Sequence, residues 1–245
     1  MENQIQTSSL SLEGNSRLFN IGEILLVLIV PILPYVLMRP WANGDPIKSA
    51  MVIWTCYIVM FVMIWTGLKM RGETWSDFGL IFKSVSAKRA LQIFGLSLIV
   101  FALGTGAFVL GSIVMGNFDG APASADFSKY DYLQGNLGML FISLASVYVV
   151  SSFAEEIIFR GFLITRIEEI GHKTKMATWI AVVLSAVIFG LIHFEWGPMG
   201  VVQTGFMGLA MAISYVWLKR KIWILVLAHM YMDTLLLVPL FLGQG

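Results

Sequence analysis

The chain has 245 residues, of which 58% are hydrophobic and only 13% are charged. Soluble globular domains carry about 25% charged residues, so the composition excludes an ordinary soluble protein and indicates an integral membrane protein. The formal net charge of +1 gives no indication of a nucleic-acid partner. The single cysteine, Cys56, excludes an intramolecular disulfide and is expected to be a small buried residue.

Apolar residues form seven runs of the length needed to cross a bilayer, which is about 20 residues for a helix. The runs cover residues 20–38, 49–68, 91–115, 137–163, 177–196, 199–218 and 222–242. Pro31 and Pro34 predict a kink in the first run. The sequence therefore predicts an all-α transmembrane bundle of about seven to eight spans, preceded by a polar cytoplasmic tail over residues 1–18.

The basic residues between the runs predict the orientation. With the N-terminus in the cytoplasm, thirteen Lys and Arg residues fall on the cytoplasmic side and three on the outer side, or twelve and three without Arg160, which lies within a run. The thirteen are Arg17, Lys69, Arg71, Lys83, Lys88, Arg89, Arg160, Arg166, Lys173, Lys175, Lys219, Arg220 and Lys221, and the three are Arg39, Lys48 and Lys129. The positive-inside rule then favours a cytoplasmic N-terminus.

The segment 73–90 links the second and third runs. It contains Trp75, Phe78, Leu80 and Phe82, followed by Lys83, Lys88 and Arg89. Aromatic and basic residues together are typical of a segment that lies on the membrane surface. We expect residues 73–90 to anchor the chain at the cytoplasmic interface; the alternative is that they dock the substrate.

Three charged residues stand close together in the fourth run. Each would cost roughly 2.5–3.5 kcal/mol at the centre of a bilayer, so their presence needs a reason. On a helix, Glu156 and Arg160 are neighbours four residues apart and are expected to pair. Glu155 points elsewhere and stays unpaired, which makes it the better candidate for a general base. The alternative is that all three lie at the cytoplasmic end of the span and face water.

Two of the three histidines also lie in apolar runs. His193 follows Phe189 by four residues, and His229 precedes Asp233 by four. A carboxylate one turn away can fix the tautomer of an imidazole. Either histidine alone would be a hydrogen-bonded packing residue, but acids and imidazoles at membrane depth are together candidates for a functional site.

These residues form three ordered motifs, Glu155-Glu156-Ile-Ile-Phe-Arg160, Phe189-Gly-Leu-Ile-His193 and His229-Met-Tyr-Met-Asp233. The sequence resembles the CPBP family of CAAX proteases and bacteriocin-processing proteins, also called Abi or lysostaphin resistance protein A-like, and is similar to its type II CAAX prenyl endopeptidases. The family patterns are Glu-Glu-x-x-x-Arg, Phe-x-x-x-His and His-x-x-x-Asn/Asp. The resemblance covers roughly residues 135–240.

The resemblance implies a glutamate-dependent intramembrane endopeptidase. Glu155 would activate a water, His193 would hold that water, and His229 with Asp233 would stabilise the oxyanion. Glu156, Arg160 and Phe189 would support the site. Many members have Asn where this chain has Asp233, and an ionised Asp cannot donate a hydrogen bond, so Asp233 is either protonated or orients His229. The mechanism needs no cofactor or metal, and the His-Glu-x-x-His zinc pattern is absent from the sequence.

The resemblance also suggests the substrate and the organisation of the chain. The substrate is expected to be a peptide or protein at the membrane, either prenylated or carrying a leader. We expect residues 19–135 to hold N-terminal spans and the interfacial segment, and residues 136–242 to form the catalytic core. From the helix rise of about 1.5 Å per residue, the motifs should converge near mid-depth if the helices are staggered, in a cavity open to the cytoplasm. The compact chain suggests a bacterial plasma membrane. The alternatives are a non-proteolytic scaffold or bacteriocin self-immunity protein and, from the intramembrane acids and histidines, a proton-coupled transporter.

Overall fold

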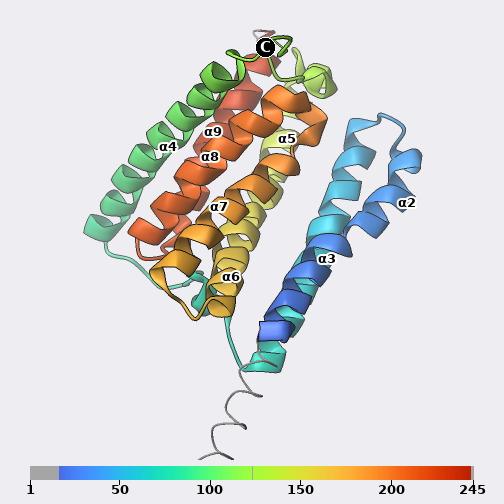
Figure 1. Ribbon diagram of the computed structural model, residues 1–245. Helices are drawn as coiled ribbons and strands as arrows, with labels where there is room; N and C mark the ends of the chain where they lie inside the picture. The colour runs from blue at the N-terminus through green and yellow to red at the C-terminus, as the bar shows by residue number, and fades with distance from the viewer. Residues whose placement is uncertain (1–16, 123, 244–245) are drawn as a thin grey trace, which may run out of the picture.

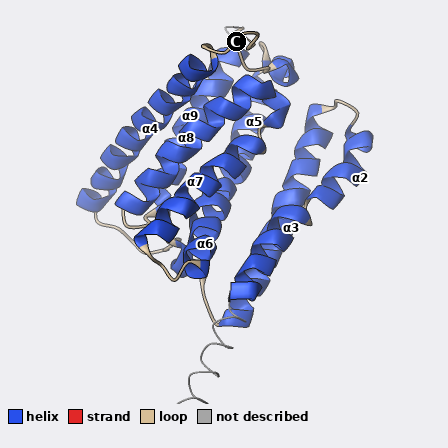
Figure 2. Ribbon diagram, in the orientation of Figure 1, coloured by secondary structure: helices blue, strands red, loops and turns tan. Residues whose placement is uncertain are grey.

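The computed structural model describes residues 17–122 and 124–243, which form a bundle of helices (Figure 1) with loops between them and no strand in the described part (Figure 2). Six helices within it are long and apolar enough to cross a membrane, namely Arg17–Ala42, Pro46–Arg71, Ala87–Met115, Leu137–Ile170, Phe194–Trp217 and Ile222–Phe241. A shorter apolar helix, α7 (Lys175–Leu191), has 17 residues, about 25 Å of helix. The all-α fold is confirmed, and each predicted run corresponds to one of these helices. The predicted tail lies outside the described residues except for its last two.

The first span and α3 (Pro46–Arg71) form a hairpin at one side of the bundle (Figure 1). The first span is interrupted at Val30–Pro31, and α2 (Ile32–Ala42) continues it. Proline has no N–H to donate and its ring crowds the preceding turn, which explains the predicted kink. Asp45 then begins α3 by accepting a 2.9 Å hydrogen bond from the backbone of Lys48.

The other side of the bundle depends on glycines that let helices touch. α4 (Ala87–Met115), α8 (Gly197–Trp217) and α9 (Ile222–Phe241) pack together, and α7 packs on α8. A Cβ added at Gly111 of α4 would lie 2.9 Å from the Cα of Gln203, and one at Gly190 of α7 would lie 2.7 Å from the carbonyl oxygen of Val201. Small residues permit such close backbone approach. Gly190 thus brings the end of α7 that carries the second motif against α8.

The fourth span differs from the expected regular α-helix. It consists of α5 (Leu137–Val147), a π-helix η3 (Tyr148–Leu163) and α6 (Ile164–Ile170). π-helical segments form i→i+5 hydrogen bonds and occur frequently at functional sites. All of the residues from Ala154 to Leu163 are buried, including Glu155, Glu156 and Arg160. The alternative in which these charges face water at the end of the span is therefore wrong.

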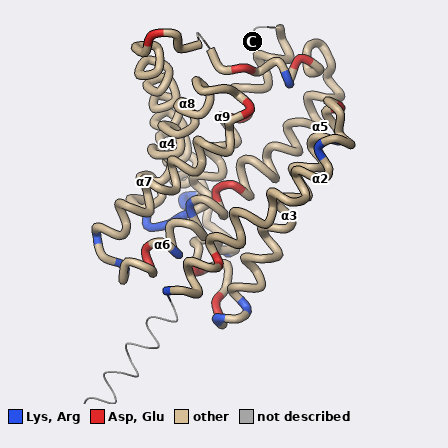
Figure 3. Tube along the Cα trace, turned by 45° about the vertical axis from the view of Figure 1, so that its right-hand side comes forward, with Lys and Arg blue, Asp and Glu red and all other residues tan. Residues whose placement is uncertain are grey.

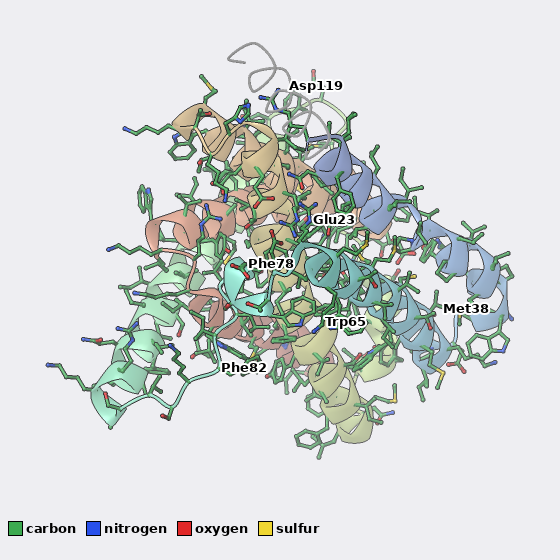
Figure 4. All side chains as sticks on the ribbon, turned by 90° about the horizontal axis from the view of Figure 1, so that it is seen from below. Glu23, Met38, Trp65, Phe78, Phe82 and Asp119 are labelled. Atoms are coloured by element: carbon green, nitrogen blue, oxygen red, sulfur yellow. The ribbon has the colours of Figure 1, made fainter. Side chains whose placement is uncertain are left out.

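The segment between α3 and α4 packs into the protein at two residues, whereas residues 81–86 are exposed (Figure 4). It contains the short helix η1 (Trp75–Phe78), and both Phe78 and Leu80 are buried. The hydroxyl of Tyr215 donates a 3.0 Å hydrogen bond to the carbonyl of Phe78, which holds the segment against α8. Phe82, in contrast, is 73% exposed. The expected position on the membrane surface fits Phe82 but not Phe78 or Leu80.

Most of the Lys and Arg residues lie at the end of the bundle where the described chain starts (Figure 3), which we call the basic end. Glu23 of the first span binds Arg71 of α3 at 2.6 Å and Arg166 of α6 at 3.0 Å. Arg166 also binds Glu73 at 2.5 Å. These ion pairs join the hairpin to the fourth span at the basic end.

Candidate active site

Residues of the first and third motifs meet in the interior of the bundle. The Nδ1 atom of His229, on α9, lies 2.8 Å from Oε1 of Glu156, on η3, and Nη1 of Arg160 lies 3.0 Å from the same oxygen. A carboxylate accepts hydrogen bonds, so both nitrogens donate to it. The predicted Glu156–Arg160 pair is confirmed. Glu156 also holds His229, a contact that helix spacing could not indicate because the two residues lie on different helices.

Glu155 has a different environment from its neighbour. It is 6% exposed, and its Oε1 accepts a 2.6 Å hydrogen bond from the hydroxyl of Tyr57, on α3. Its Oε2 is buried and has no hydrogen-bond partner among the described residues. Glu155 therefore has one oxygen held in place and one available to a small polar molecule. Tyr57 was missed by the sequence reasoning, because no spacing rule connects α3 with η3.

The second motif packs beside this cluster. Nδ1 of His193 lies 2.8 Å from the carbonyl oxygen of Phe189, and since a carbonyl only accepts, Nδ1 carries a proton. The ring centroid of the buried Phe189 is 4.9 Å from that of His193 and 6.1 Å from that of His229. The guanidinium carbon of Arg160 lies 4.2 Å from the same phenylalanine ring. Phe189 thus packs against a member of each motif.

Two serines that precede the first motif hold Asp233. Ser152 Oγ donates to Asp233 at 2.6 Å, and Ser151 Oγ donates to its other oxygen at 3.3 Å. Ser151 Oγ also lies 3.3 Å from Nε2 of His229, whereas Asp233 is 4.0 Å from that nitrogen. A separation of 4.0 Å is too long for a hydrogen bond. The carboxylate in direct contact with His229 is therefore Glu156. Asp233 is linked to His229 through Ser151, which contacts both residues.

A cavity of about 2200 Å³ has Glu155, His193, His229 and Asp233 on its wall. Most of its lining comes from α2, α3, α5, η3 and α9, and residues of α4 and α8 complete it. All four side chains that the sequence suggests as catalytic thus line one cavity, as expected if the motifs converge. Among the described residues, no three His, Cys, Asp or Glu side chains form a group that could hold a metal ion.

The cavity extends away from the basic end. Its lining includes the turn at Asn43, three residues of η2 (Ser128–Leu133), namely Lys129, Tyr130 and Tyr132, and η4 (Phe194–Trp196). Glu195 of η4 accepts hydrogen bonds from Tyr35 of α2 at 2.6 Å and from Lys129 of η2 at 3.1 Å, and so joins the three elements. Figure 1 shows this end of the bundle opposite the start of the described chain. The cavity lining thus reaches the end of the bundle opposite the start of the described chain. The cytoplasmic N-terminus and the cytoplasmic opening of the cavity both stay predictions.

Residues 137–235 match the family model described as type II CAAX prenyl endopeptidase Rce1-like. The matched segment contains all three motifs and excludes the hairpin and α4. No curated protein and no solved structure matches the chain. The match agrees with the motifs, with their meeting in one buried cluster and with the apolar helices around them. Over residues 137–235, the chain is therefore similar to the CAAX proteases of the CPBP family.

Proposed function

We propose that this protein is an intramembrane endopeptidase in which Glu155 activates a water for attack on a peptide bond. The observation that carries the proposal is the state of Glu155, a buried carboxylate on a cavity wall with one oxygen unpartnered among the described residues. The match of residues 137–235 to a family model of CAAX prenyl endopeptidases supports the same class of reaction. Peptide hydrolysis needs a base for the water and a donor for the oxyanion.

In the proposed first step, Glu155 Oε2 takes a proton from water while the water oxygen bonds to the carbonyl carbon. The carbonyl π electrons move to oxygen and give a tetrahedral oxyanion. When the oxyanion re-forms the carbonyl and the C–N bond breaks, Glu155 returns the proton to the departing nitrogen, leaving a carboxylic acid and an amine. His193 lines the same cavity. Its Nδ1 is bound to the carbonyl of Phe189, so Nε2 is the nitrogen that we assign to hold the water.

His229 is the better oxyanion donor of the two third-motif residues. Its Nδ1 is fixed by Glu156 at 2.8 Å, so Nε2, when protonated, is the nitrogen that donates to the oxyanion. Asp233 accepts from Ser151 and Ser152, and an ionised carboxylate would repel a second negative charge. We assign the oxyanion contact to His229 and the placement of Ser151 to Asp233.

The cavity suggests a substrate with a large apolar part. Drug-sized ligands occupy pockets of about 300–1,000 Å³, whereas this cavity measures about 2200 Å³. Apolar residues such as Phe159, Met207 and Leu236 line it together with the polar site. Such a space fits an extended peptide with a lipid group or an apolar leader, at a bacterial plasma membrane.

The test is cleavage of quenched peptides in detergent micelles, with prenylated and unprenylated versions of each sequence. We expect wild-type protein to cleave and Glu155→Gln to lose at least about 10²-fold in kcat, the contribution typical of a general base. Glu73→Gln is the matched control, because Glu73 lies outside the cavity and pairs with Arg166. Cleavage by a folded Glu155→Gln protein would contradict the proposal. Loss of cleavage in both variants would show a general effect on folding.

A further inference from the structure

One contact of the proposed base comes from outside the matched family segment. The hydroxyl of Tyr57, on α3, donates to Glu155 Oε1 at 2.6 Å. We propose that Tyr57 is a positioning residue that fixes the Glu155 carboxylate and leaves Oε2 for the reacting water. This inference rests on the proposed function and adds a residue that the three motifs do not contain.

The geometry is that of a strong hydrogen bond. Hydroxyl donors lie about 2.5–2.7 Å from ionised carboxylates, and the Tyr57–Glu155 distance is within this range. Tyr57 provides the one side-chain hydrogen bond that Glu155 accepts among the described residues. The last torsion of a glutamate side chain is broad, so without this donor the plane of the carboxylate would be free to turn.

The tyrosine is itself held in place. Its ring packs on the main apolar core, and Trp54, one turn earlier on α3, donates a 2.8 Å hydrogen bond to Ser146 Oγ of α5. At the basic end, Arg71 ties α3 to Glu23. A hydroxyl on a helix fixed at two points can hold a carboxylate within a narrow range of positions. A misplacement of about 1 Å in a catalytic site can cost about 10²-fold in rate.

The consequence is that the catalytic centre is completed by the N-terminal helices. Residues 137–235 carry the motifs, yet the orientation of Glu155 depends on α3. Positioning should affect the chemical step more than binding, because substrate is held by the large cavity rather than by Oε1 of Glu155.

The test compares Tyr57→Phe with Tyr215→Phe. Each change removes one hydroxyl hydrogen bond of a tyrosine and keeps the ring, but only the first touches Glu155, and Tyr215 lies outside the cavity. We expect Tyr57→Phe to lower kcat by about 10–100-fold with KM changed by less than about threefold, the pattern of a lost transition-state interaction. We expect Tyr215→Phe to keep kcat within about twofold. Wild-type kcat in Tyr57→Phe, or equal losses in both variants, would overturn the inference.

A second measurement separates this inference from the proposed function. Thermal unfolding of Tyr57→Phe, Glu155→Gln and the double variant gives a cycle that needs no cleavage. Non-additive shifts in unfolding temperature would support the contact, and additive shifts would overturn it. If wild-type protein cleaves and Glu155→Gln does not, a Tyr57→Phe protein of wild-type activity refutes only the role of Tyr57. If no peptide is cleaved, the proposed function fails and the cycle still decides the contact.

Discussion

At the scale of single residues, the two adjacent glutamates have separate tasks. Glu155 keeps one oxygen available on the cavity wall, whereas Glu156 uses Oε1 to accept from both Arg160 and His229. A fully buried guanidinium is costly unless it is paired. Glu156 therefore satisfies Arg160 and at the same time sets the ring of His229. For Glu155 to take the role of Glu156, His229 would have to lie beside Glu155, and α9 would have to pack differently.

Replacing Glu156 by glutamine should destabilise the protein and stop cleavage. The amide keeps the size of the side chain but removes the charge opposite Arg160, and both residues are 0% exposed. Removing one partner of a buried ion pair costs about 3–5 kcal/mol. Thermal unfolding in detergent should show a marked fall in midpoint, larger than that of Glu169→Gln, whose pair with Arg166 is more exposed. An unchanged midpoint would mean that the Glu156–Arg160 pair contributes nothing to stability.

Asp233 and His229 can be distinguished by their replacement. If His229 contacts the oxyanion, His229→Ala should lose about 10²–10³-fold in kcat, as expected for an oxyanion donor. Asp233→Asn keeps the shape of the side chain and an oxygen that can accept from Ser152, so we expect kcat within about tenfold of wild type. Steady-state cleavage by the two variants provides the comparison. Equal losses in both would instead place Asp233 in direct contact with the reacting groups.

At the scale of elements, the apolar runs predicted the helices because a bilayer requires long uninterrupted apolar stretches. The Glu156–Arg160 pair was predictable for a similar reason, since it depends only on local helix geometry. The π-helical winding of η3 and the burial of Phe78 were not, because both depend on how distant helices pack. The same holds for the contacts of Tyr57 with Glu155 and of Ser152 with Asp233, which join different helices.

The hairpin is joined to the rest of the bundle at the cavity end by Glu195, which binds Tyr35, Arg39 and Lys129. Cys56, the one cysteine of the chain, is buried beside the carbonyl of Pro31 and lines the cavity. Glu195→Gln should weaken this junction and let α2 separate more often from its neighbours. We expect N-ethylmaleimide to modify Cys56 at least about threefold faster, because local opening exposes buried groups.

Mass spectrometry of the intact protein measures the rate of that modification. Glu169→Gln is the matched control, since it removes a carboxylate from the basic end and leaves the cavity end unchanged. Equal modification rates in wild-type and Glu195→Gln protein would show that Glu195 does not hold the hairpin closed.

At the scale of the whole molecule, the distribution of charge and the position of the cavity define a direction. The basic end carries Arg71, Arg166 and Arg220, while the cavity reaches the opposite end at η2 and the α2–α3 turn. Basic residues favour the cytoplasmic side. The charge pattern therefore predicts that the cavity opens on the outer side of the membrane, in place of the cytoplasmic opening expected from the sequence.

Single cysteines test this direction in a Cys56→Ser background. Ser124 lies in the exposed loop before η2, and Ser84 lies in the exposed part of the segment before α4. The two variants are Ser124→Cys and Ser84→Cys. A membrane-impermeant maleimide applied to intact bacterial cells should label Ser124→Cys, and should label Ser84→Cys only after permeabilisation. The reverse pattern would place the cavity opening in the cytoplasm and would show that the basic residues do not set the orientation of this chain. Because both exchanges are Ser→Cys at exposed loop positions, a difference in labelling reports the side of the membrane rather than the chemistry of the substitution. The outcome also decides from which side a peptide substrate must reach Glu155.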